Sequence, residues 1–184
     1  MALDATVGGT QSNSYSTVAD ADTFFDTRIG SSTWVGSETT IKESALVTAT
    51  FQLNRMKFIG EPTEATQYLA WPRRFVPQPD PTGVYYGQEL RLRESYEKEN
   101  EIPWRVLHAT YEMALLLIGD SSLLGDAGLR QFKRVEVGSG SRGGIVALEI
   151  NNAGLPRLMN KTIRGLIDPY TEAHSMSVPM MRAG

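Results

Sequence analysis

Residues 102–119 read IPWRVLHATYEMALLLIG, and this stretch decides the fold. Proline belongs in the first turn of a helix and glycine belongs just past its end, so Pro103 and Gly119 bracket one helix. Between them, apolar residues recur at helical spacing around most of the circumference, and only the row of Arg105, His108 and Glu112 is polar. The pattern predicts a helix that the rest of the chain, or a partner, covers on most sides. It is too short to span a bilayer.

The composition limits the classes of protein and of chemistry. A chain of 184 residues makes one domain, or one domain with extensions, and its net charge of −3 gives no global basic field for holding nucleic acid. The absence of cysteine excludes disulfides, thiolate catalysis and Cys-ligated metals. Residues 1–5 have neither a basic nor an apolar run, so we expect no signal peptide and a protein that works without crossing a membrane.

Two further helices are predicted before residue 60. Thr17 and Asp20 have the spacing of a capping box, and they begin a helix that buries Val18, Ala21, Phe25 and Ile29. Trp34 follows in a loop that packs on the core. Ser37 or Thr39 then caps a helix through about residue 56, with an apolar stripe that consists of Ile41, Ala45, Leu46, Ala49, Leu53 and Met56.

The second half of the chain predicts a hairpin and a last helix. Residues 130–137 and 145–150 alternate as strands do, so 130–150 forms a β-hairpin with residues 138–144 at its tip. The last helix runs from Pro156 to about Ile167, and Asp168-Pro169 ends it. Residues 1–14 are predicted to be an extended N-terminal arm. Residues 171–184 are interpreted as an apolar C-terminal tail that docks on a partner, with simple disorder as the alternative.

No motif predicts catalysis or a cofactor. Residues 138–143, GSGSRG, match G-x-G-x-x-G by letters, but a strand follows where a dinucleotide site needs a helix. Asp20, Asp22 and Asp26 are interpreted as a solvated helix face. His108 and His174 have no partners for a zinc site, and nothing places a nucleophile beside His108. We therefore expect no metal, no cofactor and no enzymatic activity.

One aromatic and basic motif stands before an unusual insertion. Residues 71–75, WPRRF, resemble a base-stacking and phosphate-binding pair, although a buried Trp71 with arginines at a subunit contact is the preferred interpretation. Residues 75–101 form a proline-rich and charged insertion, whose prolines argue against a regular element. Its charged part, 88–101, is interpreted as a solvated loop or short helix, with a rim that meets a neighbouring subunit as the alternative.

Four sequence pieces, taken in order, resemble one family. They are residues 15–25 (YSTVADADTFF) followed by Trp34, the alanine-rich segment 45–50 (ALVTAT), residues 67–73 (QYLAWPR), and Ile102-Pro103 leading into residues 109–114 (ATYEMA). Residues 155–170 and the preceding hairpin fit the same pattern. The order resembles the head–tail adaptor (head-completion, or connector) proteins of tailed phages, some of which are described as DnaT-like single-stranded-DNA-binding proteins.

The resemblance implies a mainly α fold, a small bundle of about four helices with a β-hairpin and extended arms, over residues 15–170. It also implies a structural virion protein of the neck, made in the cytoplasm of a bacterial host. Copies would form a cyclic homo-oligomer, a dodecamer, beneath the portal protein. The ring would bridge the portal to a tail, stopper or terminator protein, and duplex DNA would pass through it without specific binding. No membrane and no catalytic residues are implied.

Two interaction surfaces are hypothesised, together with two functions. Portal docking is assigned to Ile163, Leu166, Ile167, Tyr170, Met176, Val178, Met180 and Met181. Contact with a neighbouring subunit or the tail is assigned to Trp71, Arg73, Arg74, Arg91, Arg93, Glu94 and Glu97. The first function is the structural adaptor, which the acidic balance favours. The alternative is a replication-type single-stranded-DNA-binding protein that uses Trp71 and Arg73.

Overall fold

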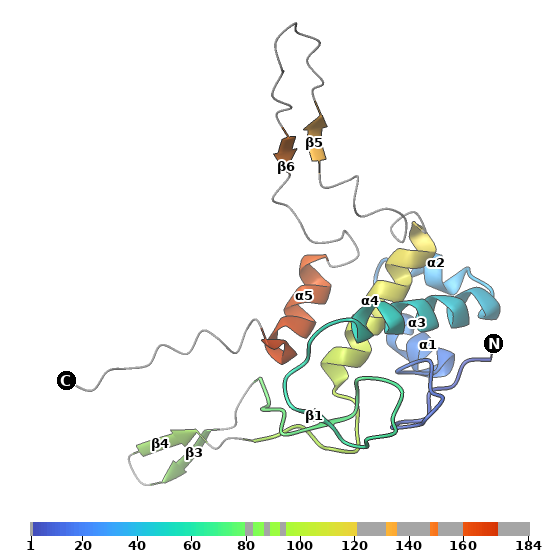
Figure 1. Ribbon diagram of the computed structural model, residues 1–184. Coiled ribbons are helices and arrows are strands. Elements are labelled where there is room, and N and C mark those ends of the chain that lie inside the picture. Colours follow the sequence, from blue (N-terminus) through green and yellow to red (C-terminus); the bar gives the residue numbers. More distant parts are fainter. Residues whose placement is uncertain are drawn as a thin grey trace, which may run out of the picture.

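The structure is a computed structural model, and it describes residues 2–79, 83–86, 89–92, 95–120, 132–135, 148–150 and 160–172. Within these ranges the chain is mainly helical (Figure 1). The predicted fold class, a small helical bundle with a hairpin, is therefore confirmed. The helices are α1 (Val18–Asp26), α2 (Ser32–Val35), α3 (Thr39–Asn54), α4 (Trp104–Gly119) and α5 (Lys161–Ile167), and a 3₁₀ helix follows at Asp168–Tyr170.

The helix α4 is the centre of the bundle. It packs against α3, α5 and α2, and eight of its residues between Val106 and Leu117 are buried. Val106, Ala109 and Ala114 are fully enclosed, which lets the neighbouring helices approach closely. The predicted helix is thus confirmed, with Pro103 at its N-cap.

The first two helices supply one aromatic side of the core. Thr17 caps α1, and its Oγ1 accepts a hydrogen bond from the Asp20 backbone N–H at 3.2 Å, as predicted. Phe25 and Trp34 are buried with their ring centroids 4.8 Å apart. Trp34 lies in α2 and not in the expected loop. The expected burial of Ile29 is wrong: α1 ends at Asp26, so Ile29 lies beyond the helix and is 99% exposed.

The helix α3 buries Ala45, Leu46, Ala49 and Leu53 against the core. Its N-cap is Glu38, where no side-chain capping bond forms, and not Ser37 or Thr39 as predicted. Ile41 lies in the first turn and is 47% exposed, so the buried stripe begins one turn later than its periodicity indicated.

The strands form three antiparallel pairs within the described residues. β1 (Glu61–Pro62) pairs with β2 (Arg73–Arg74), β3 (Gly83–Tyr86) with β4 (Glu89–Leu92), and β5 (Phe132–Val135) with β6 (Leu148–Ile150). The β5–β6 pair confirms the predicted hairpin. The β3–β4 hairpin was not predicted. The prolines that argued against a regular element all precede Gly83, so they do not interrupt it.

The N-terminal segment differs from the extended arm that was predicted. In residues 2–14 the chain turns back on itself: the Asp4 N–H donates to Asn13 Oδ1 at 2.8 Å, and the N–H groups of Asn13 and Ser14 donate to the Asp4 carbonyl oxygen. Ser12, Asn13 and Ser14 are buried. Small polar residues bind nearby backbone groups and so order a segment that lacks regular secondary structure.

The last helix begins later than predicted. The Asn160 side chain caps α5 by accepting a hydrogen bond from the Ile163 N–H at 2.9 Å, so the helix starts at Lys161 and not at Pro156. Residues 151–159 lie outside the described residues. The helix ends at Ile167, as predicted, and α5 packs against α4.

Candidate functional site

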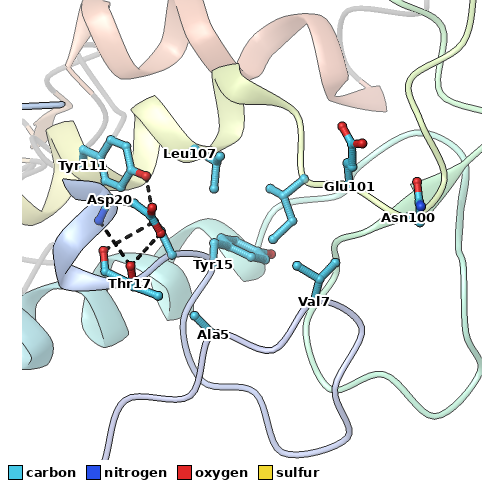
Figure 2. A pocket seen from close by; sticks show the side chains of 11 residues that line it. Ala5, Val7, Tyr15, Thr17, Asp20, Asn100, Glu101, Leu107 and Tyr111 are labelled. Carbon is cyan, nitrogen blue, oxygen red and sulfur yellow. Dashed lines mark hydrogen bonds between the residues drawn. The ribbon is translucent and has the colours of Figure 1, made fainter. Parts of the chain in front are cut away.

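A surface pocket lies between the N-terminal segment, the start of α1 and the start of α4 (Figure 2). Its cavity volume is about 430 Å³. Segments far apart in sequence form it, because residues 5–7 and the loop before Pro103 meet beside α1. The lining combines apolar, hydroxyl and carboxylate side chains: Ala5, Val7, Tyr15, Ser16, Thr17, Asp20, Asn100, Glu101, Ile102, Leu107 and Tyr111.

Hydroxyl groups hold one wall of this pocket in place. Thr17 Oγ1 donates to Asp20 Oδ2 at 2.6 Å, and the hydroxyls of Ser16 and Tyr111 lie 2.7 Å apart. Burial raises the pKa of Tyr111, and the negative charge of Asp20 raises it further. The wall therefore keeps a neutral phenol at neutral pH beside the Asp20 side chain.

The pocket is acidic. Asp20 and Glu101 are the charged residues of its lining, and both are exposed. Glu101 also pairs with the exposed Lys98 at 2.8 Å, a surface ion pair that contributes little. Such a site repels phosphate and attracts a cationic group. It is therefore unsuited to holding a nucleic acid backbone.

Trp71 belongs to the interior, so its assignment to a subunit contact or to base stacking is wrong, whereas Arg73 is half-buried. Trp71 is 1% exposed and packs edge-on against Phe58 and Tyr170. The Arg73 guanidinium donates to four backbone carbonyl oxygens, those of Phe58, Ile59, Gly60 and Ala70, at 2.6 to 3.2 Å. The Trp71 ring is therefore enclosed by the fold, and the Arg73 guanidinium is engaged by backbone acceptors.

Arg74 and Phe75, by contrast, lie on the surface. The Arg74 guanidinium carbon is 5.4 Å from the centroid of the Phe75 ring, and Phe75 is 60% exposed. Arg74 also pairs with exposed Glu61 at 3.1 Å. Phe75 has a φ of 60°, a left-handed conformation that bulky residues rarely adopt. The fold thus presents an exposed aromatic ring, on a strained backbone position, beside the Arg74 cation.

A pair of exposed aromatic rings forms a second candidate contact surface. The rings of Phe51 in α3 and Tyr68 are perpendicular, with centroids 6.4 Å apart, and they are 40% and 57% exposed. Arg55 is exposed one helical turn after Phe51. Sequence reasoning missed this pair, since the aromatic residues come from different segments and only the fold brings them together.

The residues assigned to portal docking divide into two groups. Ile163, Ile167 and Tyr170 are 0% exposed, so this part of the assignment is wrong: their apolar stripe is buried in the bundle itself. Leu166 is half-buried. The other four, Met176, Val178, Met180 and Met181, lie outside the described residues.

Of the remaining candidate contact residues, the structure describes Glu97 and Arg91. Glu97 accepts a hydrogen bond from the Tyr170 hydroxyl at 2.7 Å and so ties the insertion to the end of α5. Arg91 lies in β4, opposite Val84. Arg93 and Glu94, like the glycine-rich segment 138–143 and His174, lie outside the described residues.

Asp22, which was interpreted as solvated, and Glu112, from the polar row of α4, both pair with other elements. Asp22 accepts from Trp34 Nε1 at 2.7 Å and from Lys42 Nζ at 2.8 Å, and these bonds lower its pKa although burial acts in the opposite sense. Glu112 is buried and pairs with Arg28. Helical periodicity could not show either pairing, because the partners come from other elements.

His108 packs between aromatic rings. Its ring centroid lies 4.6 Å from that of Phe24 and 5.1 Å from that of Trp104. Burial lowers its pKa, and Arg28 lowers it further. Among the described residues, no group of three His, Cys, Asp or Glu residues could hold a metal ion, and no helix has the length and apolarity to cross a membrane.

The fold and surface define a small helical protein with an acidic pocket and exposed aromatic–arginine contacts. The chain belongs to the family described as "Putative DnaT-like ssDNA binding protein", whose sequence model matches residues 1–183. No curated protein and no solved structure shows a significant match to the chain.

Proposed function

We propose that this protein is a non-enzymatic binder of single-stranded DNA, and that Arg74 and Phe75 form its contact. The family description is the first support. The observation that carries the proposal is Phe75, a large aromatic residue that is 60% exposed in a left-handed backbone conformation. Strained residues that persist on a surface are often found at ligand-binding sites.

The chemistry of the pair suits a single strand. A base stacks on an exposed aromatic ring whatever its sequence, with about 1–3 kcal/mol per base. Arg74 lies beside the ring and can bind a phosphate oxygen through its planar guanidinium. Its exposed pair with Glu61 is weak, so a phosphate group competes with it readily. The Phe51–Tyr68 pair, with Arg55 nearby, offers a second stacking position.

The test is the affinity of the full chain for a fluorescent oligothymidine, measured by anisotropy, with Phe75→Gly as the first variant. Glycine adopts the left-handed conformation freely, so this variant keeps or gains stability while it loses the ring. We expect its affinity to fall by about fivefold or more, the equivalent of one lost stacking contact.

The matched control is Tyr96→Ala, which removes an exposed aromatic ring that belongs neither to the Arg74–Phe75 contact nor to the Phe51–Tyr68 pair. We expect wild-type affinity from it. Equal affinity of Phe75→Gly and wild type would remove the proposed contact, and no binding by the wild type would remove the function itself.

The structural adaptor is the second candidate, and the charge favours it. The net charge of −3 and the acidic pocket disfavour retention of DNA, as a channel wall for sliding duplex requires. Trp71 and Arg73 were the sequence candidates for DNA binding. In the structure Trp71 is buried and Arg73 donates hydrogen bonds to the backbone. On this proposal the protein is a virion neck component, a dodecameric ring between the portal and a tail or stopper protein.

Quantitative mass spectrometry of purified particles tests the adaptor. A ratio near one copy per portal subunit supports it. Abundance in the infected-cell lysate together with absence from particles would contradict it and would leave DNA binding as the function.

A further inference from the structure

We propose that the acidic pocket of Figure 2 receives a basic side chain from the β5–β6 hairpin of a second copy of this chain. The contact joins two different surfaces, the pocket of one copy and the hairpin of the next. It is therefore a head-to-tail contact. This interaction is separate from single-stranded DNA binding and does not depend on it.

The pocket has the chemistry that a long basic side chain needs. Lysine and arginine have an apolar stem and a charged end, and each part requires a different surface. Ile102, Leu107 and the Tyr15 ring provide apolar lining, while Asp20 and Glu101 provide the carboxylates. Figure 2 shows these two carboxylates on different sides of the pocket. A cation between them is attracted from both sides.

The size of the pocket agrees with this occupant. A volume of about 430 Å³ lies within the range of roughly 300–1,000 Å³ found for pockets that hold small molecules. A lysine or arginine side chain therefore fits. Its apolar stem would displace water from the aromatic and aliphatic lining.

The hairpin has the complementary charge. Residues 130–150 contain four basic residues and two acidic ones, a net charge of +2 in a chain whose total is −3. Two of the basic residues, Lys133 and Arg134, lie within β5 itself. The basic segment 130–150 and the acidic pocket would therefore attract each other between copies.

A two-stranded hairpin gains stability when it packs on a further surface. β5 pairs with β6 in a sheet of two strands (Figure 1), and a two-stranded hairpin on its own is marginally stable in water. Docking on a second copy would cover one face of it. Charge and stability therefore favour the same contact.

Cysteine trapping tests the contact directly, because the chain has no cysteine of its own. Asn100 is exposed and lines the pocket, so Asn100→Cys and Arg134→Cys are prepared separately and mixed under mild oxidation. We expect a disulfide-linked dimer from the mixture. The control replaces Asn100→Cys with Ser44→Cys, which lies exposed on α3. Equal cross-linking of the two mixtures would overturn the proposal.

Charge reversal supplies an independent measurement by sedimentation velocity. We expect Glu101→Lys and Arg134→Glu each to raise the dissociation constant of self-association by about tenfold, and a mixture of the two single variants to restore it. Glu101 is exposed, and circular dichroism checks the fold of both variants. A wild type that stays monomeric at about 1 mM, or a mixture without restored association, would overturn the proposal.

Discussion

At the scale of single residues, Arg73 and Arg74 show how neighbouring identical residues take opposite roles. Both belong to β2, where side chains alternate between faces. Arg73 turns inward and binds four carbonyl oxygens, whereas Arg74 turns outward to Glu61 and Phe75. Without the Arg73 guanidinium, these four carbonyl oxygens would need water as a donor or would be left unpaired.

We expect Arg73→Ala to lower the free energy of unfolding by about 2–4 kcal/mol, because it leaves several carbonyl oxygens without a donor. Arg73→Lys should recover only part of this loss, since an ammonium group lacks the planar fork that reaches several acceptors. Urea denaturation followed by tryptophan fluorescence measures both. Arg74→Ala is the matched control, with an expected loss of less than about 1 kcal/mol. Equal losses at the two positions would contradict the assignment.

The WPRRF motif illustrates what the sequence could not resolve at this scale. The sequence alone favoured a buried Trp71, and the structure agrees. It could not tell which of two adjacent arginines points inward, because that depends on the register of β2 against β1. Phe75 received no role of its own. It has a left-handed φ, and Gly60 approaches the neighbouring backbone so closely that an added Cβ would overlap the Arg74 carbonyl oxygen.

Tyr15 predicts a pH dependence at the alkaline end. Burial raises its pKa above the ordinary value of 10.0, and its hydroxyl donates to Asn54 Oδ1 at 2.9 Å. A raised folded-state pKa means that its contribution is complete below pH 10 and is lost as the pH rises, because the unfolded chain ionises first. Urea denaturation between pH 8 and 11 should show a loss of about 1.4 kcal/mol per pH unit above 10 from this residue. Tyr15→Phe should remove that part of the slope, and an unchanged slope would contradict it.

At the scale of elements, α5 is part of the core. Ile163 and Ile167 are fully buried against α4, whereas Leu166 is half-buried on the same helix. We expect Ile163→Ala to lower the free energy of unfolding by about 2–4 kcal/mol, and Leu166→Ala to lower it by clearly less. Chemical denaturation of both variants makes the comparison. Similar small losses would mean that α5 is dispensable to the fold and is free to dock elsewhere.

The elements divide into those that local sequence determines and those that it does not. The helix α4 and the β5–β6 hairpin were predicted because their periodicity is regular and their ends carry turn residues. The helix α2 has four residues, too few to show a period. The β3–β4 hairpin was obscured by prolines that stand just before it. The apolar stripe of α5 was recognised, but periodicity cannot say whether the chain itself or a partner covers it.

At the scale of the whole molecule, the charge decides how DNA binding should depend on salt. The net charge is −3, and the proposed contact contains Arg74, with Arg55 beside the second aromatic pair. Each phosphate contact to single-stranded DNA contributes about −0.7 to the slope of log K against log salt. Two arginines therefore predict a slope no steeper than about −1.5, with affinity that depends more on the aromatic rings than on charge.

Anisotropy titrations with oligothymidine at several salt concentrations test this prediction. A shallow slope combined with loss of affinity in Phe75→Gly is expected if stacking dominates binding. A slope of about −3 or steeper would require more cationic contacts than this contact contains, and would contradict it. The absence of binding at the lowest salt, together with near-equal numbers of this chain and the portal in particles, would instead favour the adaptor. The acidic surface then has a simple physical role, since it lets duplex DNA pass without being held.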